Sequence, residues 1–147
     1  MIKWIFIAIA AISGAAMALQ GTFNAAMGKI IGVWESTLIV HIIGTITVLA
    51  IIVLFGIGFD NFGKLTSVPW YAFLGGLLNV IIIYIVVRTI PKVGVGNATT
   101  AIIVAQISTA VLIDSLGAFG MKRCGFQYLD LLGILFLAIG AHILLMD

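Results

Sequence analysis

Five long hydrophobic segments divide the chain, and short stretches that hold most of its charged residues separate them. Each segment is about 19 to 24 residues long, which is the length an α-helix needs to cross a bilayer. The spans are predicted at residues 4–27, 36–58, 70–90, 94–116 and 128–146. The pattern therefore predicts an all-α integral membrane protein, with one five-helix membrane domain over residues 1–147.

Short connections are expected between these spans. Turn-forming or polar residues stand at 28–29, 59–69, 91–92 and 117–127. Pro91 is expected to close the third helix, because proline disfavours helical geometry in the residue before it. An odd number of spans places the two termini on opposite sides of the membrane.

Composition agrees with this pattern and narrows the function. The chain is 63% hydrophobic and 8% charged, whereas soluble domains carry about 25% charged residues, so a water-soluble globule is excluded. No stripe of Lys and Arg is present that would bind nucleic acid. Cys124 is the only cysteine, which excludes an intrachain disulfide and a cysteine metal cluster. No catalytic, cofactor or metal motif is found, and we expect neither an enzyme nor a cofactor.

Small residues form a stripe on the first predicted helix, at steps of three and four that favour close approach of another backbone. They are Gly14, Ala18, Gly21, Ala25 and Gly28. On the fifth helix Gly133 and Gly140 share a face. Both helices are candidates for contact with a second subunit, and packing within one chain remains the alternative for the fifth.

Polar side chains recur well inside the predicted spans. Counting from the span ends places Asn79 and Gln106 near the middle of the bilayer and other polar residues within a few turns of it. The candidate substrate-binding residues are Gln20, Asn24, His41, Asn79, Gln106 and Thr109. Membrane transporters bind their substrates near the bilayer midplane. The alternative is that these groups only join helices by hydrogen bonds, and their number favours a site.

Two ionisable residues are candidates for proton coupling. His41 lies a turn and a half into the second span, and a histidine can change its charge near neutral pH. Asp114 lies on the last turn of the fourth span, where it is placed to reach headgroup water.

Lys and Arg are almost evenly divided between the two faces that five spans create. Lys3, Lys64, Lys122 and Arg123 fall on one face, and Lys29, Arg88 and Lys92 on the other. An excess of such residues in short loops sets which face stays in the cytoplasm. With four against three, the chain is expected to insert in both orientations and to pair with an inverted copy of itself.

Five sequence stretches resemble the bacterial YdcZ-like family, which is EamA-related and belongs to the drug/metabolite transporter superfamily. They are residues 18–29 (ALQGTFNAAMGK), 41–45 (HIIGT), 69–80 (PWYAFLGGLLNV), 90–106 (IPKVGVGNATTAIIVAQ) and 112–120 (LIDSLGAFG). The resemblance covers nearly the whole chain in order. It implies a five-helix half-transporter of the bacterial cytoplasmic membrane that works as an antiparallel homodimer or with a closely related paired subunit.

The resemblance also indicates which residues of this chain occupy the polar positions of the family. It makes Gln20 and Asn24 the polar pair of the first helix, and Gln106 and Asp114 the polar positions of the fourth. His41 and Asn79 depart from the residue types the family pattern favours, and both are expected to alter substrate choice.

Together these observations favour a secondary transporter that moves a small polar organic metabolite or drug-like solute by alternating access. Its partners would be membrane lipids, the solute and a second subunit. Three alternatives stay open: a proton-coupled cation or multidrug exporter, a passive channel, and a membrane assembly factor that transports nothing. The substrate, the direction and the coupling ion are not encoded in a recognisable motif.

Overall fold

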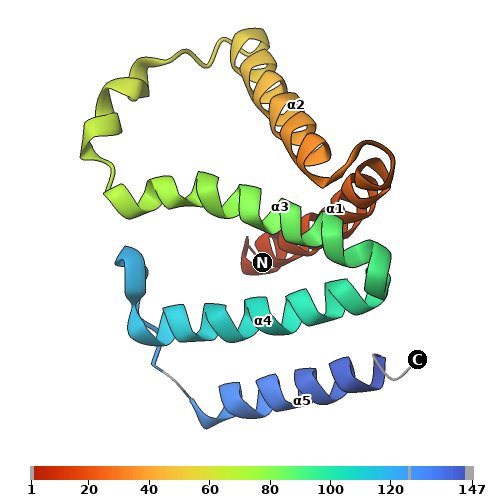
Figure 1. The fold of residues 1–147 in the computed structure, drawn as a ribbon. Coiled ribbons are helices and arrows are strands. Elements are labelled where there is room, and N and C mark those ends of the chain that lie inside the picture. Colours follow the sequence, from red (N-terminus) through yellow and green to blue (C-terminus); the bar gives the residue numbers. More distant parts are fainter. Residues whose placement is uncertain (1, 126, 145–147) are drawn as a thin grey trace. The chain divides into compact units, whose positions relative to one another are not determined.

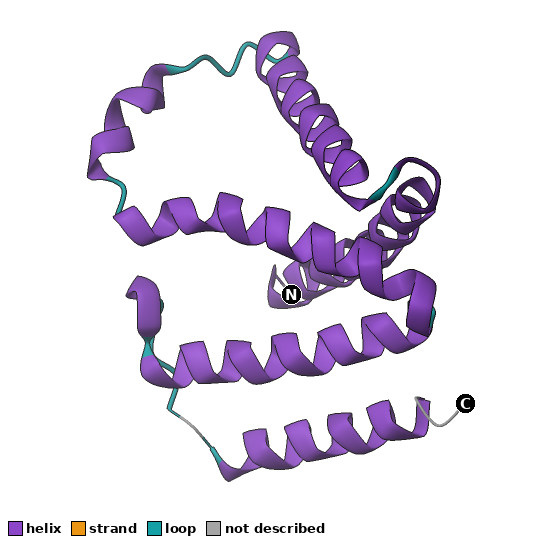
Figure 2. Cartoon of the chain, in the orientation of Figure 1, coloured by secondary structure: helices purple, strands orange, loops and turns teal. Residues whose placement is uncertain are grey.

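A computed structural model describes residues 2–125 and 127–144, and within these residues the chain forms helices and loops but no strand (Figure 2). The long helices are α1 (Ile2–Ile31), α2 (Val33–Leu54), α3 (Leu74–Val93), α4 (Val95–Leu116) and α5 (Tyr128–Leu144), as labelled in Figure 1. Three short 3₁₀ helices complete the order: η1 (Asp60–Ser67), η2 (Trp70–Phe73) and η3 (Ala118–Gly120). The prediction of an all-helical protein is confirmed.

Four of the described helical segments are long and apolar enough to cross a membrane. They are Lys3–Ile31, Val33–Leu54, Trp70–Val93 and Val95–Leu116. The helix α5 is also apolar but has 17 residues, and residues 145 and 146 of the predicted fifth span lie outside the described part of the chain. The fifth crossing therefore stays a prediction.

The first predicted turn is wrong, because α1 continues through Gly28 and Lys29 to Ile31. Gly28 faces another helix instead: a Cβ added there would collide with Cγ1 of Val87 on α3. The turn comes at Gly32, whose φ of 99° lies in the region that favours glycine. The sequence Gly28-Lys29 predicts a turn, but Gly28 instead allows α1 to pack closely against α3.

Pro91 does not close α3, which runs two residues further to Val93. Proline disrupts a helix by removing one N–H and by crowding the carbonyl four residues earlier, and in the last turn few hydrogen bonds remain to be lost. The helix ends at Gly94, where φ is 85°.

The second span lies three to four residues earlier than predicted, since α2 runs over Val33–Leu54 rather than over residues 36–58. Gly56 and Gly58 adopt φ values of 62° and 73°, which ends the helix and turns the chain. The connection that follows contains a short helix of its own, since residues 60–67 form η1. Likewise η2 precedes α3, so the third span begins as a 3₁₀ turn.

The chain divides into two compact units, the first ending at Lys92 and the second beginning at Val93. In the first unit α1 packs against α2, and the buried side chains include Ala25, Val87 and Ile90. The hydroxyl of Ser36, which is fully buried, donates to the carbonyl of Asn24 at 3.1 Å. This bond ties the start of α2 to the end of α1.

The second unit consists of α4 and α5, which pack against each other, with η3 and a loop between them. Ala98 and Ala141 are its buried apolar residues. The carbonyl of Asp114 accepts the N–H groups of Gly117 and Cys124, at 3.3 and 2.9 Å. These bonds hold both the start of the loop and its later part, at Cys124, against the end of α4.

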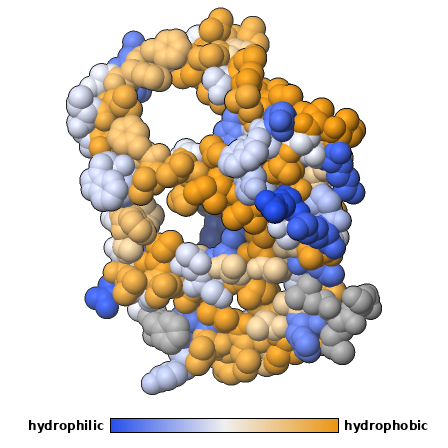
Figure 3. Space-filling view, in the orientation of Figure 1, coloured by the Kyte–Doolittle hydropathy of each residue, from blue (hydrophilic) through white to orange (hydrophobic). Residues whose placement is uncertain are grey.

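Large apolar side chains cover most of the surface in view (Figure 3). Among the described residues the buried hydrophobic ones number six, and long runs of Ile, Leu, Val and Phe are exposed on every long helix. Soluble monomers rarely expose apolar patches of this extent. Lipid or another protein surface must cover these faces.

The Gly28–Val87 contact gives a stability prediction. Replacing Gly28 with alanine should destabilise the protein by about 1–3 kcal/mol, because the added methyl overpacks a β-branched side chain that is 1% exposed. Thermal unfolding in detergent would measure this. The control is Gly76→Ala on α3, where an added Cβ meets nothing within 4 Å. Equal melting temperatures for the two variants would contradict this packing of α1 on α3.

Candidate functional site

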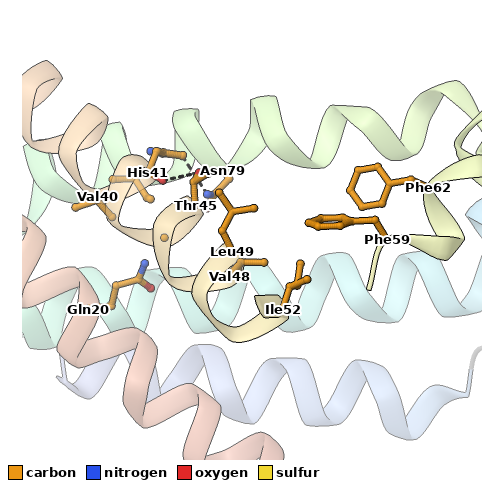
Figure 4. Close-up of a pocket in the computed structure, with 12 residues that line it drawn as sticks. Gln20, Val40, His41, Thr45, Val48, Leu49, Ile52, Phe59, Phe62 and Asn79 are labelled. Atoms are coloured by element: carbon orange, nitrogen blue, oxygen red, sulfur yellow. Dashed lines mark hydrogen bonds between the residues drawn. The ribbon is translucent and has the colours of Figure 1, made fainter. Parts of the chain in front are cut away.

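A cavity of about 490 Å³ lies within the first unit, among α1, α2, α3 and the segment that joins α2 to α3. Cavities that hold small organic ligands have volumes of about 300–1,000 Å³. Its lining residues are Gln20, Val40, His41, Gly44, Thr45, Val48, Leu49, Ile52, Phe59, Phe62, Asn79 and Ile83 (Figure 4).

Each of the three long helices of this unit contributes a predicted binding residue to the cavity. Gln20 comes from α1, His41 from α2 and Asn79 from α3. All three are among the binding residues predicted from the sequence. The structure therefore brings half of the predicted set together, from segments up to 59 positions apart in the chain.

Both ring nitrogens of His41 have partners. Nδ1 lies 2.7 Å from the carbonyl oxygen of Thr37, one turn earlier on α2. Nε2 lies 3.1 Å from the amide nitrogen of Asn79 on α3. Because a carbonyl only accepts, Nδ1 carries the proton and donates, and Nε2 is left with a lone pair that accepts the Asn79 N–H. These two bonds hold the imidazole in one orientation between α2 and α3.

The polar end of the cavity retains free hydrogen-bonding capacity. The bond to His41 uses one N–H of Asn79 and leaves its Oδ1 and second N–H for other groups. The carboxamide of Gln20 makes no hydrogen bond with another described residue. Thr45 donates its hydroxyl to the carbonyl of His41 at 2.9 Å and keeps its oxygen lone pairs. A ligand here would meet both donors and acceptors.

The opposite end of the cavity is aromatic. Phe59 and Phe62 have ring centroids 5.3 Å apart and planes at 72°, which is an edge-to-face arrangement. The N–H of Phe62 donates to the carbonyl of Phe59 at 2.9 Å, so the first turn of η1 sets the spacing of the two rings. Sequence reasoning missed this pair because it treated residues 59–69 as a connection. Two aromatic residues three positions apart beside Asp60 and Asn61 were the available signal.

None of the residues that line the cavity carries a fixed charge. Within residues 2–125 and 127–144, no cluster of three or more His, Cys, Asp or Glu is placed to hold a metal ion. The arrangement can therefore bind a solute by hydrogen bonds and apolar contact, and it offers no nucleophile paired with a base.

A sequence model of one protein family, described as "Putative inner membrane exporter, YdcZ", matches residues 5–143. The chain belongs to the YdcZ family. This confirms the resemblance seen in the sequence and, with the apolar helices, supports a multi-pass membrane protein with a transport function. No curated protein and no solved structure matches the chain.

The other predicted site residues of this YdcZ family member are not among the residues that line the cavity. Asn24 on α1 is 6% exposed, and its carbonyl holds the hydroxyl of Ser36. Gln106, Thr109 and Asp114 belong to α4 in the second unit, and all three are exposed. Whether they join a binding site stays a prediction.

The small residues of the YdcZ family member separate into packed and open positions. A Cβ added at Gly21 would lie 3.1 Å from side-chain atoms of Val86 and Ile90 on α3, so Gly21 serves packing within the unit. At Gly14, Gly133 and Gly140 nothing lies within 4 Å of such an atom. Ala18 is half-buried on the same stripe, and its carbonyl accepts the hydroxyl of Thr22 at 2.9 Å.

A second cluster of polar and aromatic side chains lies outside the cavity lining. Arg88 donates to the hydroxyl of Tyr84 at 2.7 Å, and the ring of Tyr84 lies 4.4 Å from that of Trp34. Tryptophan and tyrosine concentrate at the level of lipid headgroups. This cluster indicates that the C-terminal end of α3 lies at the membrane interface. The partner of Arg88 there is the uncharged hydroxyl of Tyr84.

Proposed function

We propose that the protein is a secondary transporter that exports a small, uncharged organic solute across the bacterial cytoplasmic membrane. The observation that carries the proposal is the convergence of Gln20, His41 and Asn79, from three apolar helices, on one cavity. In a membrane interior, polar side chains face a cavity or the interior of the protein, and they mark substrate pathways. The exporter description of the family supports the direction.

The working unit that we propose is an antiparallel pair of five-span chains, with α5 as the fifth span. The even division of Lys and Arg between the loops supports it, because neither orientation is favoured. The open glycines at 14, 133 and 140 provide surfaces where a second backbone can approach. Gln106 and Thr109 on α4, both exposed in the single chain, would add polar groups at the junction between the two copies.

Transport in such a pair would proceed by alternating access. The two inverted copies are equivalent, so a rocking motion that closes the cavity toward one side opens it toward the other at equal energy. A closely related paired subunit in place of the second copy would work in the same way.

The alternatives make different predictions about the transported species. A proton-coupled cation exporter needs a carboxylate near the bound cation, and the residues that line the cavity include none. A channel would conduct without saturation or counterflow. An assembly factor would bind no solute, and its polar residues would affect only assembly.

The Gln20→Ala variant tests the function. Removing a carboxamide that has no partner among the described residues should leave the fold intact but lower solute flux about tenfold, as expected for the loss of one or two hydrogen bonds to substrate. Purified protein in liposomes would be screened for saturable flux and counterflow with uncharged amides and polyols, and separately with organic cations. Gln127→Ala, in the exposed loop before α5, is the matched control. Proton-driven flux of cations alone would contradict the proposal.

A further inference from the structure

We infer that the transported solute has two unlike ends: a neutral amide or hydroxyl group that binds among Gln20, His41 and Asn79, and a flat aromatic group that binds against Phe59 and Phe62. This inference rests on the proposed function and narrows its substrate class. It adds specificity residues in the segment that joins α2 to α3.

One face of α2 connects the two ends of the cavity. His41, Thr45, Val48 and Ile52 follow one another at steps of four and three, so they lie along one stripe of the helix. The eleven residue steps from His41 to Ile52 correspond to a rise of about 16 Å. Polar groups stand at the first end of this stripe and aliphatic ones at the other, and Gly44 adds no side chain beside it. The cavity is thus graded from polar to apolar along its length.

The aromatic end suits a ring better than an aliphatic chain. The edge-to-face pair of Phe59 and Phe62 presents both a ring face and a ring edge, and an added ring can complete either arrangement favourably. On η1, the 3₁₀ helix that contains Phe62, Nζ of Lys64 donates a hydrogen bond to Oδ1 of Asn61 at 2.9 Å. This bond braces the turn that positions the aromatic pair.

The absence of charge on the lining selects against charged solutes. Moving an ammonium or carboxylate group out of water without a partner of opposite charge is strongly unfavourable. The lining includes no Asp, Glu, Lys or Arg that could provide such a partner. An aromatic amide is therefore favoured over the corresponding free amino acid, although both carry the same ring.

Three probes separate these contributions: N-acetylphenylalanine amide, N-acetylglycine amide with the same polar groups and no ring, and free phenylalanine with the same ring and two charges. Binding to the purified full chain in lipid nanodiscs, and flux in liposomes, would be measured for each. Wild-type protein should bind the phenylalanine amide at least several-fold more tightly than the glycine amide, and should bind free phenylalanine most weakly.

Phe59→Leu and Phe62→Leu should each reduce the ratio of the two amide affinities by roughly two- to tenfold, because leucine keeps apolar bulk but loses the ring geometry. Phe73→Leu, an exposed aromatic position on η2 outside the cavity lining, should leave the ratio unchanged. Gln20→Ala should weaken both amides to the same degree and so preserve the ratio.

Several results would overturn the inference. One is equal affinity of wild-type protein for the two amides, or no affinity for either. Another is an equal loss for both amides in the two phenylalanine variants, which would show that these rings serve folding or contact lipid. If a Gln20-dependent flux of another uncharged solute persists in these cases, the proposed function stands and only the two-ended substrate is wrong.

Discussion

The Asn79→Ala variant should transport its solute about tenfold more slowly than the wild-type protein while its stability changes by under about 1 kcal/mol. Hydrogen bonds between membrane helices contribute about 0.6 kcal/mol on average, so the fold loses little. The site loses more, because Asn79 both offers groups to the solute and donates to Nε2 of His41 at 3.1 Å. Without that donor the imidazole of His41 loses the contact from α3 that fixes its orientation toward the solute.

A double-mutant cycle would measure this coupling. Flux and thermal stability would be compared for Asn79→Ala, His41→Ala and the double variant. If the two side chains act as one unit, the double variant should transport no more slowly than the slower single variant. Thr47→Ala on α2, whose hydroxyl bonds only its own helix and does not line the cavity, is the control. Stability losses in both single variants with normal flux would show that the pair only joins α2 to α3.

Variants forced into one orientation should lose transport when expressed alone and recover it when two opposite variants are expressed together. Adding Ser67→Lys and Gln127→Lys raises the Lys and Arg balance from four against three to six against three. The set Lys3→Gln, Lys122→Gln and Glu35→Lys reverses it to two against four. Short-loop Lys and Arg residues set orientation, so each set should favour one insertion.

Growth or flux assays in cells would measure the transport activity of each variant alone and of the two together, with expression matched between strains. Ser67→Gln with Gln127→Asn changes the same positions without adding charge and should remain active alone. Full activity of either charge-shifted variant expressed by itself would contradict an inverted pair. It would favour a parallel assembly or a working monomer.

The helices were predictable because hydrophobic length is a direct signal of membrane crossing, and four predicted spans coincide closely with helices long enough to cross. The residues at which the helices begin and end were harder to predict. The helix α1 passes through Gly28 because that glycine fits against Val87, and no local pattern reveals a partner nearly sixty residues later. Pro91 was expected to stop α3, but at the last turn the helix tolerates it.

The candidate site was predictable in its polar part and not in its apolar part. Gln20, His41 and Asn79 stood out because polar side chains are costly at bilayer depth. Asn24 has the same signal, yet it is buried beside Ser36 and lies outside the cavity lining. Phe59 and Phe62 gave no comparable signal, because aromatic residues are common near membrane interfaces. Their place in the cavity lining depends on the fold of η1, which the local sequence did not predict.

Labelling of Cys124 tests the inverted pair most directly. It is the only cysteine of the chain and is exposed in the loop between α4 and α5, so the unmodified protein can be used. Intact cells or right-side-out vesicles would be treated with a membrane-impermeant maleimide, before and after permeabilisation. An antiparallel homodimer predicts that about half of the chains react before permeabilisation and the rest only afterwards. Reaction of all chains, or of none, before permeabilisation would contradict it.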